Sequence, residues 1–379
     1  MRILLVGEYS RLHNSLKEGL ISLQHEVTIV SSGDGFKNYP SDYSIDAKWS
    51  KKPALNIFRQ LIYRFFRYDF AALERGLRFF FLLPKFKDFD VVQLINEAPV
   101  KTNPALELYL LKRIKKQNHK LYLLSCGTSY LNLTFLMARK PLKSILTPYF
   151  EDKSLHSKYR YIFDYLTKGH IRLHDFIYEN CQGIIASDFD YVLPLQGDKK
   201  FIGLIPNPVN WTKLGYKKPE TNTGIVIFLG INQWNYHQKG IRYFEEALQL
   251  IKAKYPGKVT VIIAQNTPYN DYIEMYDKAH ILLDQVYAYD QGYNALEAMA
   301  KGKVVFTGAE KEFSEYYKLT EKVAINAIPD VAYLVKELSF LIENPEEISA
   351  ISTRARAFIE KEHDYVKIAE KYIEAWNAN

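Results

Sequence analysis

Apolar runs and helical patterns alternate along the first half of the chain. A continuous apolar run at residues 3–6 ends at Gly7, and a second run at 27–30 follows a segment whose leucines recur at helical spacing. Three more short runs read as buried strands, at 91–95, 121–125 and 183–187, and a helical pattern at 106–114 separates the first two of these. Because alternating strands and helices form parallel sheets, the pattern predicts a doubly wound α/β unit.

The alternation starts again in the second half. Residues 205–210 read Ile-Pro-Asn-Pro-Val-Asn, a turn-rich junction where one lobe ends. Strand-like apolar runs follow at 224–229, 259–264 and 304–307, and an amphipathic helical pattern covers 241–251. A chain of 379 residues is long enough for two domains with separate cores. We therefore expect two parallel-sheet lobes, 1–207 and 208–359, with ligands at the carboxyl ends of their strands.

Composition indicates a soluble globular protein. Hydrophobic residues make up 47% of the chain and charged residues 25%. No stretch approaches the run of about 18 uncharged apolar residues that a membrane span needs. The chain reaches Glu8 and Arg11 without an apolar signal-peptide core, which predicts a cytosolic protein. The two cysteines, Cys126 and Cys181, provide neither a disulfide framework nor a metal cluster.

The net charge of +7 is concentrated in one window. Residues 51–87 contain nine lysines or arginines against two acidic residues, together with eight phenylalanines. A basic, aromatic segment suits an anionic membrane surface or a lipid-linked phosphate. The same pattern also fits a pair of helices that bury their aromatic residues and turn their arginines to water, and the two interpretations are compatible.

The first loop argues against a dinucleotide-dependent dehydrogenase. After the run at 3–6 the sequence is Gly7-Glu-Tyr-Ser-Arg-Leu-His13, which lacks the G-x-G-x-x-G pattern. Gly7, Glu8 and His13 follow one predicted strand and Thr128 follows another, so all four would face the ligand cleft if the two lobes close on each other. Gly7, Glu8 and Thr128 are candidate contacts on the first-lobe side of the cleft, the side on which a second substrate, the acceptor, would bind. His13 is a candidate catalytic or acceptor contact, although any loop histidine would look the same.

The most informative segment is 292–305, Gly-Tyr-Asn-Ala-Leu-Glu-Ala-Met-Ala-Lys-Gly-Lys-Val-Val. Strong helix formers follow Gly292, Gly302 is a candidate helix stop, and Val304 begins a buried strand. Glu297 thus lies near a helix N-terminus, where unpaired N–H groups and a partial positive charge collect phosphates. A carboxylate there can accept hydrogen bonds from two ribose hydroxyls. The chemistry suggests a nucleotide ligand, unless Glu297 is an ordinary solvated glutamate.

The segment from Leu296 to Val305 resembles the second half of the signature of the family 4 glycosyltransferases. These are retaining enzymes of the GT-B fold, in which two Rossmann-like domains face a central cleft. The resemblance implies that Glu297 holds the donor ribose and that the C-terminal helix, within residues 360–379, crosses back to the first lobe. The family has a second glutamate eight residues earlier, which contacts the donor sugar. This chain has Tyr289 there, so either Asp290 does that work from a shifted position or a backbone group replaces it.

The resemblance also places the donor diphosphate. The family has a Gly-Arg pair and then a Lys-Gly pair; here Asn232 takes the approximate place of the arginine, and Lys239-Gly240 is retained. Because negative charge builds on the departing diphosphate, Lys239 is the main catalytic candidate, with Asp290 and His13 beside it. The donor-binding candidates are Gly230, Asn232 and Lys239 around the first turn, Asn266 and Gln285 near the base, and Gly292, Tyr293, Asn294 and Glu297 at the helix.

No metal or other cofactor is expected. Asp88-Phe-Asp90 and Asp188-Phe-Asp190 both spell D-x-D, the metal motif of the other major glycosyltransferase fold. Asp88 and Asp90 precede a predicted strand, whereas a nucleotide-bound metal would sit at a strand's exit, and no His or Cys partner on a helix supports either pair. The sequence therefore predicts a metal-independent reaction, with the nucleotide sugar as a substrate.

Together these features predict a cytosolic, membrane-associated retaining glycosyltransferase. It would move a sugar from a UDP- or GDP-sugar to a glycan or lipid-linked acceptor, in the synthesis of cell-surface polysaccharide or another glycan. Two other classes stay open: a GT-B nucleotide-sugar epimerase, and a non-catalytic relative that binds a partner. The basic window and the lack of an evident acid–base histidine pair argue against the epimerase, and the missing glutamate and arginine prompt the non-catalytic class. The sequence shows no nucleic-acid motif.

Overall fold

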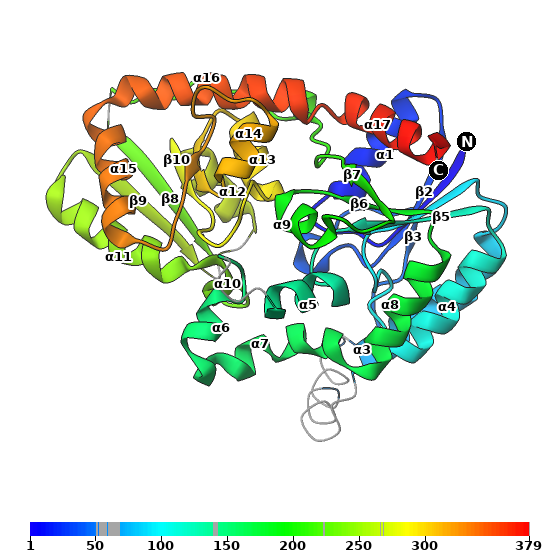
Figure 1. Ribbon diagram of the computed structural model, residues 1–379. Helices are drawn as coiled ribbons and strands as arrows, with labels where there is room; N and C mark the ends of the chain where they lie inside the picture. The colour runs from blue at the N-terminus through cyan, green and yellow to red at the C-terminus, as the bar shows by residue number, and fades with distance from the viewer. Residues whose placement is uncertain are drawn as a thin grey trace.

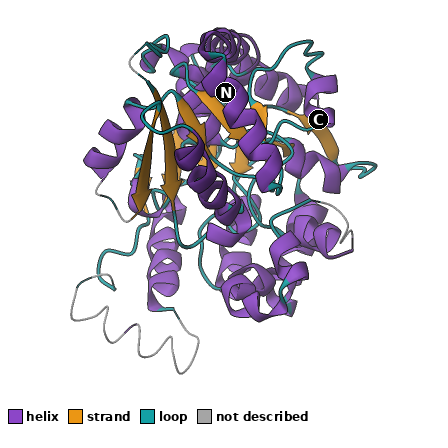
Figure 2. Ribbon diagram, turned by 90° about the vertical axis from the view of Figure 1, so that its left-hand side faces the viewer, coloured by secondary structure: helices purple, strands orange, loops and turns teal. Residues whose placement is uncertain are grey.

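The computed structural model describes residues 1–50, 52, 59, 69–138, 143–222, 224–265, 267 and 269–378. Within these residues the chain forms two lobes, each built on a parallel sheet with helices packed around it (Figures 1 and 2). This confirms the predicted fold class of two doubly wound α/β units. None of the described helices combines the length and the apolar character that a membrane crossing requires.

The first lobe contains a sheet with the strand order β3-β2-β1-β4-β5-β6-β7. Its strands are β1 Arg2–Val6, β2 Glu26–Ser31, β3 Tyr43–Ser44, β4 Val91–Leu94, β5 Lys120–Ser125, β6 Gly183–Ala186 and β7 Phe201–Leu204. Successive residues of β1 enter different cores, Leu4 and Val6 on one face and Ile3 and Leu5 on the other. Side chains alternate between the faces of a strand, so apolar residues at every position of 3–6 mean a strand covered on both faces.

The first lobe's helices connect and cover these strands. They are α1 Leu12–Ser22, α3 Phe70–Leu82, α4 Pro104–Lys116, α5 Tyr130–Ala138, α6 Thr147–Glu151, α7 His156–Phe163, α8 Lys168–Asn180 and α9 Phe189–Val192. Short 3₁₀ turns lie at η1 Gly35–Lys37, η2 Leu83–Lys85, η3 Lys153–Leu155, η4 Asp164–Leu166 and η5 Leu193–Leu195.

The second lobe contains a sheet with the order β12-β11-β10-β8-β9. Its strands are β8 Ile225–Ile231, β9 Val259–Gln265, β10 Ile281–Leu283, β11 Val304–Thr307 and β12 Ile325–Asn326. A 3₁₀ turn, η6 Trp211–Lys213, precedes it, and its helices are α10 Tyr236–Lys239, α11 Ile241–Lys254, α12 Tyr269–Asp277, α13 Tyr293–Ala300, α14 Lys311–Tyr316, α15 Val331–Glu343 and α16 Pro345–Glu362. The central strand β10 is not recognisable from the sequence, because three apolar residues between His280 and Asp284 are too short a run to distinguish from a loop.

The C-terminal helix α17 (Tyr365–Ala378) lies against α1 of the first lobe (Figure 1). Gly19 permits the contact, because a Cβ atom at this position would come within 2.1 Å of the Tyr365 carbonyl oxygen. The Trp376 carbonyl accepts hydrogen bonds from the Lys120 ammonium at 2.8 Å and the Tyr122 hydroxyl at 3.0 Å. The end of the chain is thereby fixed to the first lobe, while α16 spans from the second lobe toward it.

Candidate functional site

The carboxyl ends of strands from both sheets meet at the boundary between the lobes. A cavity of about 230 Å³ lies there. Its first-lobe lining includes Gly127 and Thr128 after β5 and Asp188 after β6, and its second-lobe lining includes Gln285 and Gly292 between β10 and α13. Ligands of doubly wound sheets bind at such strand ends, so this boundary is the candidate site.

Lys239 lies in this region, paired with a carboxylate. Its ammonium nitrogen is 2.7 Å from Oδ1 of Asp284, whose side chain is almost fully buried just after β10. The side-chain amide of Asn294, in the first turn of α13, donates to the same oxygen at 3.3 Å. Gly240 ends α10 with φ +65°, and a Cβ atom there would come within 2.3 Å of Val286. The tight turn therefore fixes Lys239 beside the Asp284 loop.

Glu297 lies one turn beyond Asn294 on α13. Its side chain makes no hydrogen bond with any residue that the structure describes, so its carboxylate is available to a ligand. Burial raises the pKa of Glu297, and the positive charges of Arg11, Lys37 and Lys301 oppose this rise. Arg11 and Lys37 belong to the first lobe, so the carboxylate faces across the boundary. Lys239 and Glu297 thus share one neighbourhood through Asp284 and Asn294.

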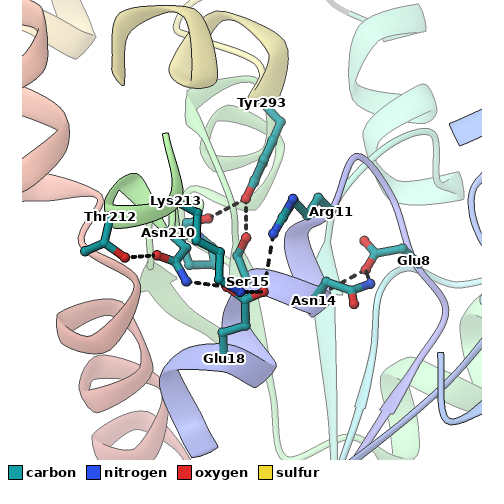
Figure 3. A network of polar contacts seen from close by, with 10 residues as sticks. Glu8, Arg11, Asn14, Ser15, Glu18, Asn210, Thr212, Lys213 and Tyr293 are labelled. Carbon is teal, nitrogen blue, oxygen red and sulfur yellow. Dashed lines mark hydrogen bonds and ion pairs between the residues drawn. The ribbon is translucent and has the colours of Figure 1, made fainter. Parts of the chain in front are cut away.

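Tyr293, the first residue of α13, joins the lobes through its hydroxyl group (Figure 3). This hydroxyl is hydrogen-bonded to the Ser15 hydroxyl of α1 and donates to the Pro208 carbonyl at 2.9 Å. Nearby, the Glu18 carboxylate accepts from Asn210 and pairs with Arg11 at 3.3 Å and Lys213 at 2.9 Å. The Tyr293 side chain is therefore a structural link, and only its backbone remains as a candidate ligand contact.

Asp290 lies in a cluster with the D-x-D pair of β6. Oxygen atoms of Asp188, Asp190 and Asp290 lie within 4.8 Å of one another. The backbone amide of Phe189 donates to Asp290 at 3.0 Å, and the amide of Tyr289 donates to Asp190 at 3.2 Å, so each lobe's aspartate accepts from the other lobe. Burial and the neighbouring carboxylates raise the pKa of Asp290 and of Asp188 well above the usual range, and burial raises that of Asp190 to about 6.

This cluster bears on the metal-independent reaction that the sequence predicts, which stays a prediction. Asp188 and Asp190 have no His or Cys partner on a helix in the sequence pattern, but the fold brings the carboxyl group of Asp290 to them from the other lobe. Three carboxylates are a donor set that fits a hard cation such as Mg²⁺. The D-x-D pair directly after β6 was a signal for this position, but its partner is about a hundred residues away in sequence.

A second charged contact crosses the boundary beside the cluster. The Lys143 ammonium pairs with the Glu310 carboxylate and donates to the Ala327 carbonyl at 3.2 Å. Lys143 lies in the first lobe and also lines the cavity. Lys143 is not recognisable from the sequence, because an isolated lysine before a short helix carries no pattern.

The first-lobe candidates are less accessible than expected. Gly7 has φ +90°, and a Cβ atom there would come within 2.3 Å of Ile95. Glu8 is buried and accepts from the backbone amides of His13 and Asn14, and burial raises its pKa to about 7. His13 has no exposed surface; its Nδ1 lies 2.8 Å from the Gly7 carbonyl oxygen, and burial lowers its pKa to about 4. His13 therefore offers no surface to a ligand, and it can affect a ligand only by holding the Gly7 loop in position.

The remaining donor-side candidates differ in position. Asn232 is exposed, and its side-chain oxygen accepts from the Trp234 amide at 3.0 Å. Gly230 lies within β8 under Tyr272, whose hydroxyl oxygen would be 2.9 Å from a Cβ atom at Gly230. Asn266 lies outside the described residues. Gln285, Gly292 and Thr128 all line the cavity between the lobes.

Comparison with known proteins identifies the fold as GT-B. Sucrose-phosphate synthase from Thermosynechococcus elongatus superposes with a TM-score of 0.61 at 13% identity, covering 100% of this chain and 99% of that protein. HepE from Anabaena, solved in complex with UDP and glucose, gives 0.60 at 10% identity with 100% of both chains covered. UDP-GlcNAc 2-epimerase from Neisseria meningitidis, bound to UDP-GlcNAc, gives 0.51 at 13% identity, again over 100% of both chains.

The second lobe also matches a family model. Residues 232–374 match the family described as Glycosyl transferase-like, and this range contains Lys239, Asp284, Asp290 and Glu297. A search of curated protein sequences finds no match. The chain therefore has a GT-B fold whose second lobe is similar to glycosyl transferase-like proteins.

Asp190→Asn should stabilise the protein at pH 8 and not at pH 4. The pKa of Asp190 is raised in the folded state, so the folded state binds the proton more tightly than the unfolded chain does. The resulting stabilisation is present at low pH and is lost as the pH rises from about 4 through 6. Asparagine keeps an oxygen for the Tyr289 amide without the charge. We expect a gain of about 2 to 3 kcal/mol at pH 8, measured by chemical unfolding.

Asp88→Asn is the matched control, because Asp88 belongs to the exposed D-x-D pair. It should change stability little at either pH. An equal gain for Asp190→Asn at pH 4 and pH 8, or no gain at pH 8, would contradict the electrostatic interpretation.

Proposed function

We propose that this protein is a retaining glycosyltransferase that moves a sugar from a UDP- or GDP-sugar to a glycan or lipid-linked acceptor. The observation that carries the proposal is the grouping of Lys239, Asp284, Asn294 and Glu297 at the carboxyl end of the second sheet, facing the first lobe. The family match of residues 232–374 and the nucleotide-bound GT-B neighbours support it. Synthesis of a cell-surface polysaccharide by a cytoplasmic enzyme is the setting that we propose.

In this proposal the donor lies with its diphosphate at the N-terminus of α13. The first amides of a helix have no acceptor within the helix, so Tyr293 and Asn294 can donate to phosphate oxygens. The Glu297 carboxylate, one turn further, accepts from the ribose hydroxyls. Lys239 stabilises the negative charge that grows on the diphosphate as the anomeric bond breaks.

Asp284 keeps the Lys239 ammonium in place before the donor arrives. Its other oxygen lies 3.4 Å from the Thr307 hydroxyl, so the carboxylate is held from both sides. A lysine held in this way needs little reorganisation when the diphosphate binds, which is how fixed donors lower a barrier. The aspartates around Asp290 line the adjoining cavity, where the transferred sugar would lie.

Lys239→Ala should reduce the rate of glycosyl transfer by about a hundredfold to a thousandfold. The cause is the loss of one fixed donor to the leaving diphosphate. Transfer is measured as nucleoside diphosphate release with donor and acceptor present. Because the variant leaves the buried Asp284 without its cation, thermal unfolding is followed in Lys239→Ala and in the double variant with Asp284→Asn.

Lys252→Ala is the control, since Lys252 is exposed at the end of α11. It should keep the wild-type rate. If the Lys239→Ala enzyme is folded and fully active, Lys239 does not belong to the active site.

Nucleotide-sugar epimerisation is the second candidate function. The similarity to UDP-GlcNAc 2-epimerase of Neisseria meningitidis over the whole chain favours it, and so does the buried aspartate cluster beside the proposed sugar position. Incubation with the donor alone separates the two functions. A transferase leaves the sugar configuration unchanged and at most hydrolyses the donor slowly, whereas an epimerase converts it, which nuclear magnetic resonance of the sugar detects.

We also propose that the protein binds the inner face of the cell membrane through the first lobe. In the described part of the 51–87 window, Phe81 on α3 is 74% exposed, and Trp49, which comes just before the window, is 65% exposed. These residues line an apolar groove of about 700 Å³ together with Leu77 and Arg78. Apolar side chains next to basic ones are the pattern that anionic membrane surfaces bind.

Flotation with anionic vesicles should recover the protein, and recovery should fall as salt rises from 0.05 to 0.5 M, conditions over which the screening length shortens about threefold. Phe81→Ser should weaken recovery severalfold. Phe340→Ser, at an equally apolar exposed position on α15, should not. Recovery that is independent of salt and of Phe81 would contradict this membrane surface.

A further inference from the structure

The loops after β1 and β2 are joined to each other and hold two cations toward the second lobe. The Asp34 carboxylate accepts from the Ser10 backbone amide at 2.9 Å and lies 3.6 Å from the Lys37 ammonium. Lys37 in turn donates to the Ser10 hydroxyl at 3.1 Å. The two loops are neighbours because β1 and β2 are adjacent parallel strands that end at the same edge. Ser10 precedes Arg11, so these contacts also hold the backbone of Arg11.

The backbone of these loops is strained. Ser10, Arg11 and Asp34 have φ angles of 50°, 74° and 58°, a left-handed conformation that costs energy for residues other than glycine. Such conformations persist where the surrounding contacts over-determine them, and they concentrate at ligand clamps and active sites. Here the Asp34 and Lys37 contacts provide that support. The strained conformation sets the orientation of Arg11 at the N-terminus of α1.

Arg11 and Glu297 lie near the contact between α1 and α13. The Ser15 hydroxyl of α1 meets the Tyr293 hydroxyl of α13 (Figure 3). Arg11 is the residue just before α1, and its carbonyl oxygen accepts from the Ser15 amide at 2.9 Å, whereas Glu297 is one turn after Tyr293 on α13. The charges of Arg11 and Lys37 both act on the Glu297 carboxylate. The two cations therefore face the carboxylate that we place on the donor ribose.

Each carboxylate next to these two cations is shared with a further cation. Asp34 has both Lys37 and Lys101 within 4 Å, and Glu18 has both Arg11 and Lys213. Two carboxylates are thus shared among four cations. Arg11 meets Glu18 through a single contact of 3.3 Å, which leaves most of its five N–H donors for another partner. Glu8 is a third carboxylate nearby, and burial raises its pKa to about 7.

We propose that Arg11 and Lys37 form a two-cation clamp for a phosphate or diphosphate group bound between the lobes, opposite Glu297. A guanidinium binds phosphate oxygens through two parallel hydrogen bonds, and an ammonium adds a point charge beside it. Asn232, which takes the approximate place of an arginine in the family pattern, is uncharged. The clamp supplies positive charge that Asn232 lacks. The identity of the ligand rests on the proposed function: the phosphate belongs either to the nucleotide donor or to a phosphorylated acceptor.

Calorimetry with the full-length protein tests the clamp. The probes are UDP, GDP, uridine, guanosine and inorganic pyrophosphate, and the variants are Arg11→Gln, Lys37→Gln, and Arg11→Lys, which keeps the charge without the paired geometry. Each glutamine variant should weaken binding of the preferred nucleoside diphosphate about tenfold to a hundredfold, with nucleoside binding unchanged. Lys213→Gln is the matched control, because it also removes a Glu18 partner but lies outside the clamp; it should change affinity less than about twofold.

The two sources of phosphate give different results. If the clamp holds the donor, the variants lose affinity for the nucleoside diphosphate. If it holds an acceptor phosphate, that affinity is unchanged, and pyrophosphate binding to protein saturated with the nucleotide is lost instead. The clamp is overturned if folded Arg11→Gln and Lys37→Gln proteins keep wild-type affinity in both measurements, or if Lys213→Gln weakens binding equally.

Failure of the proposed function has its own signature. In that case the wild-type protein binds neither UDP nor GDP, and Lys239→Ala has no effect on any probe. Pyrophosphate alone then decides the clamp: binding that both glutamine variants weaken supports it, and wild-type protein without pyrophosphate affinity overturns it. Thermal unfolding of each variant identifies a protein that has lost its fold, and Arg11→Lys then replaces Arg11→Gln, with an expected loss of severalfold.

Discussion

The structure depends on polar contacts that hold the carboxyl ends of two parallel sheets face to face. A single buried link shows how this is done. The Tyr293 hydroxyl bonds both to Ser15 of the first lobe and to the carbonyl of Pro208 in the junction, so the start of α13 has a fixed position relative to α1. An unpaired hydroxyl at a buried position costs about 1 to 3 kcal/mol. This cost favours the arrangement of the two helices in which the Tyr293 hydroxyl makes both hydrogen bonds. The position of Glu297 follows, because it is on the same helix.

The loop that leads from β10 into α13 is also attached to the first lobe. Asp290 accepts from the Phe189 amide, and Asp190 accepts from the Tyr289 amide, so the segment just before Gly292 is bonded reciprocally to the first lobe. The segment that leads into α13 therefore has two cross-lobe hydrogen bonds just before Gly292, and the Tyr293 contact just after it. A ligand that enters between the lobes meets a loop whose backbone has already been ordered, and pre-ordering of this kind lowers the entropy cost of binding.

Much of the fold was predictable because both sheets are parallel and covered on two faces. The strand at 3–6 is an uninterrupted apolar run, the run at 91–95 is interrupted only by Gln93, and the run at 304–307 is apolar up to Thr307. Such runs have few other interpretations in a chain with intervening helical patterns. Strand β10 could not be found in this way. Its three residues are central in the sheet because β8 and β11 pair with them, and that support comes from residues distant in sequence.

The candidate site was predictable only where the sequence repeats a known local pattern. Lys239 and Glu297 belong to short motifs, so their neighbourhood could be expected. Arg11 and Lys37 belong to no motif, and their position depends on which strands are adjacent and on left-handed backbone angles that the sequence does not reveal. The aspartate cluster has the same origin, since Asp188 and Asp290 meet only when the lobes do.

The sequence differs from the family 4 pattern that it resembles at Asn232 and Tyr289, and the contacts between the lobes relate these two differences to each other. Asn232 and Tyr289 stand where the family 4 pattern has a cation and a carboxylate, and the first lobe brings groups of both kinds to the same boundary: the cations Arg11 and Lys37 near Glu297, and the carboxyl groups of Asp188 and Asp190 near Asp290. A charge supplied from the opposite lobe acts only when the lobes are close. The charges at this boundary therefore depend on how the two lobes sit against each other, because Glu297 of the second lobe is opposed by cations of the first.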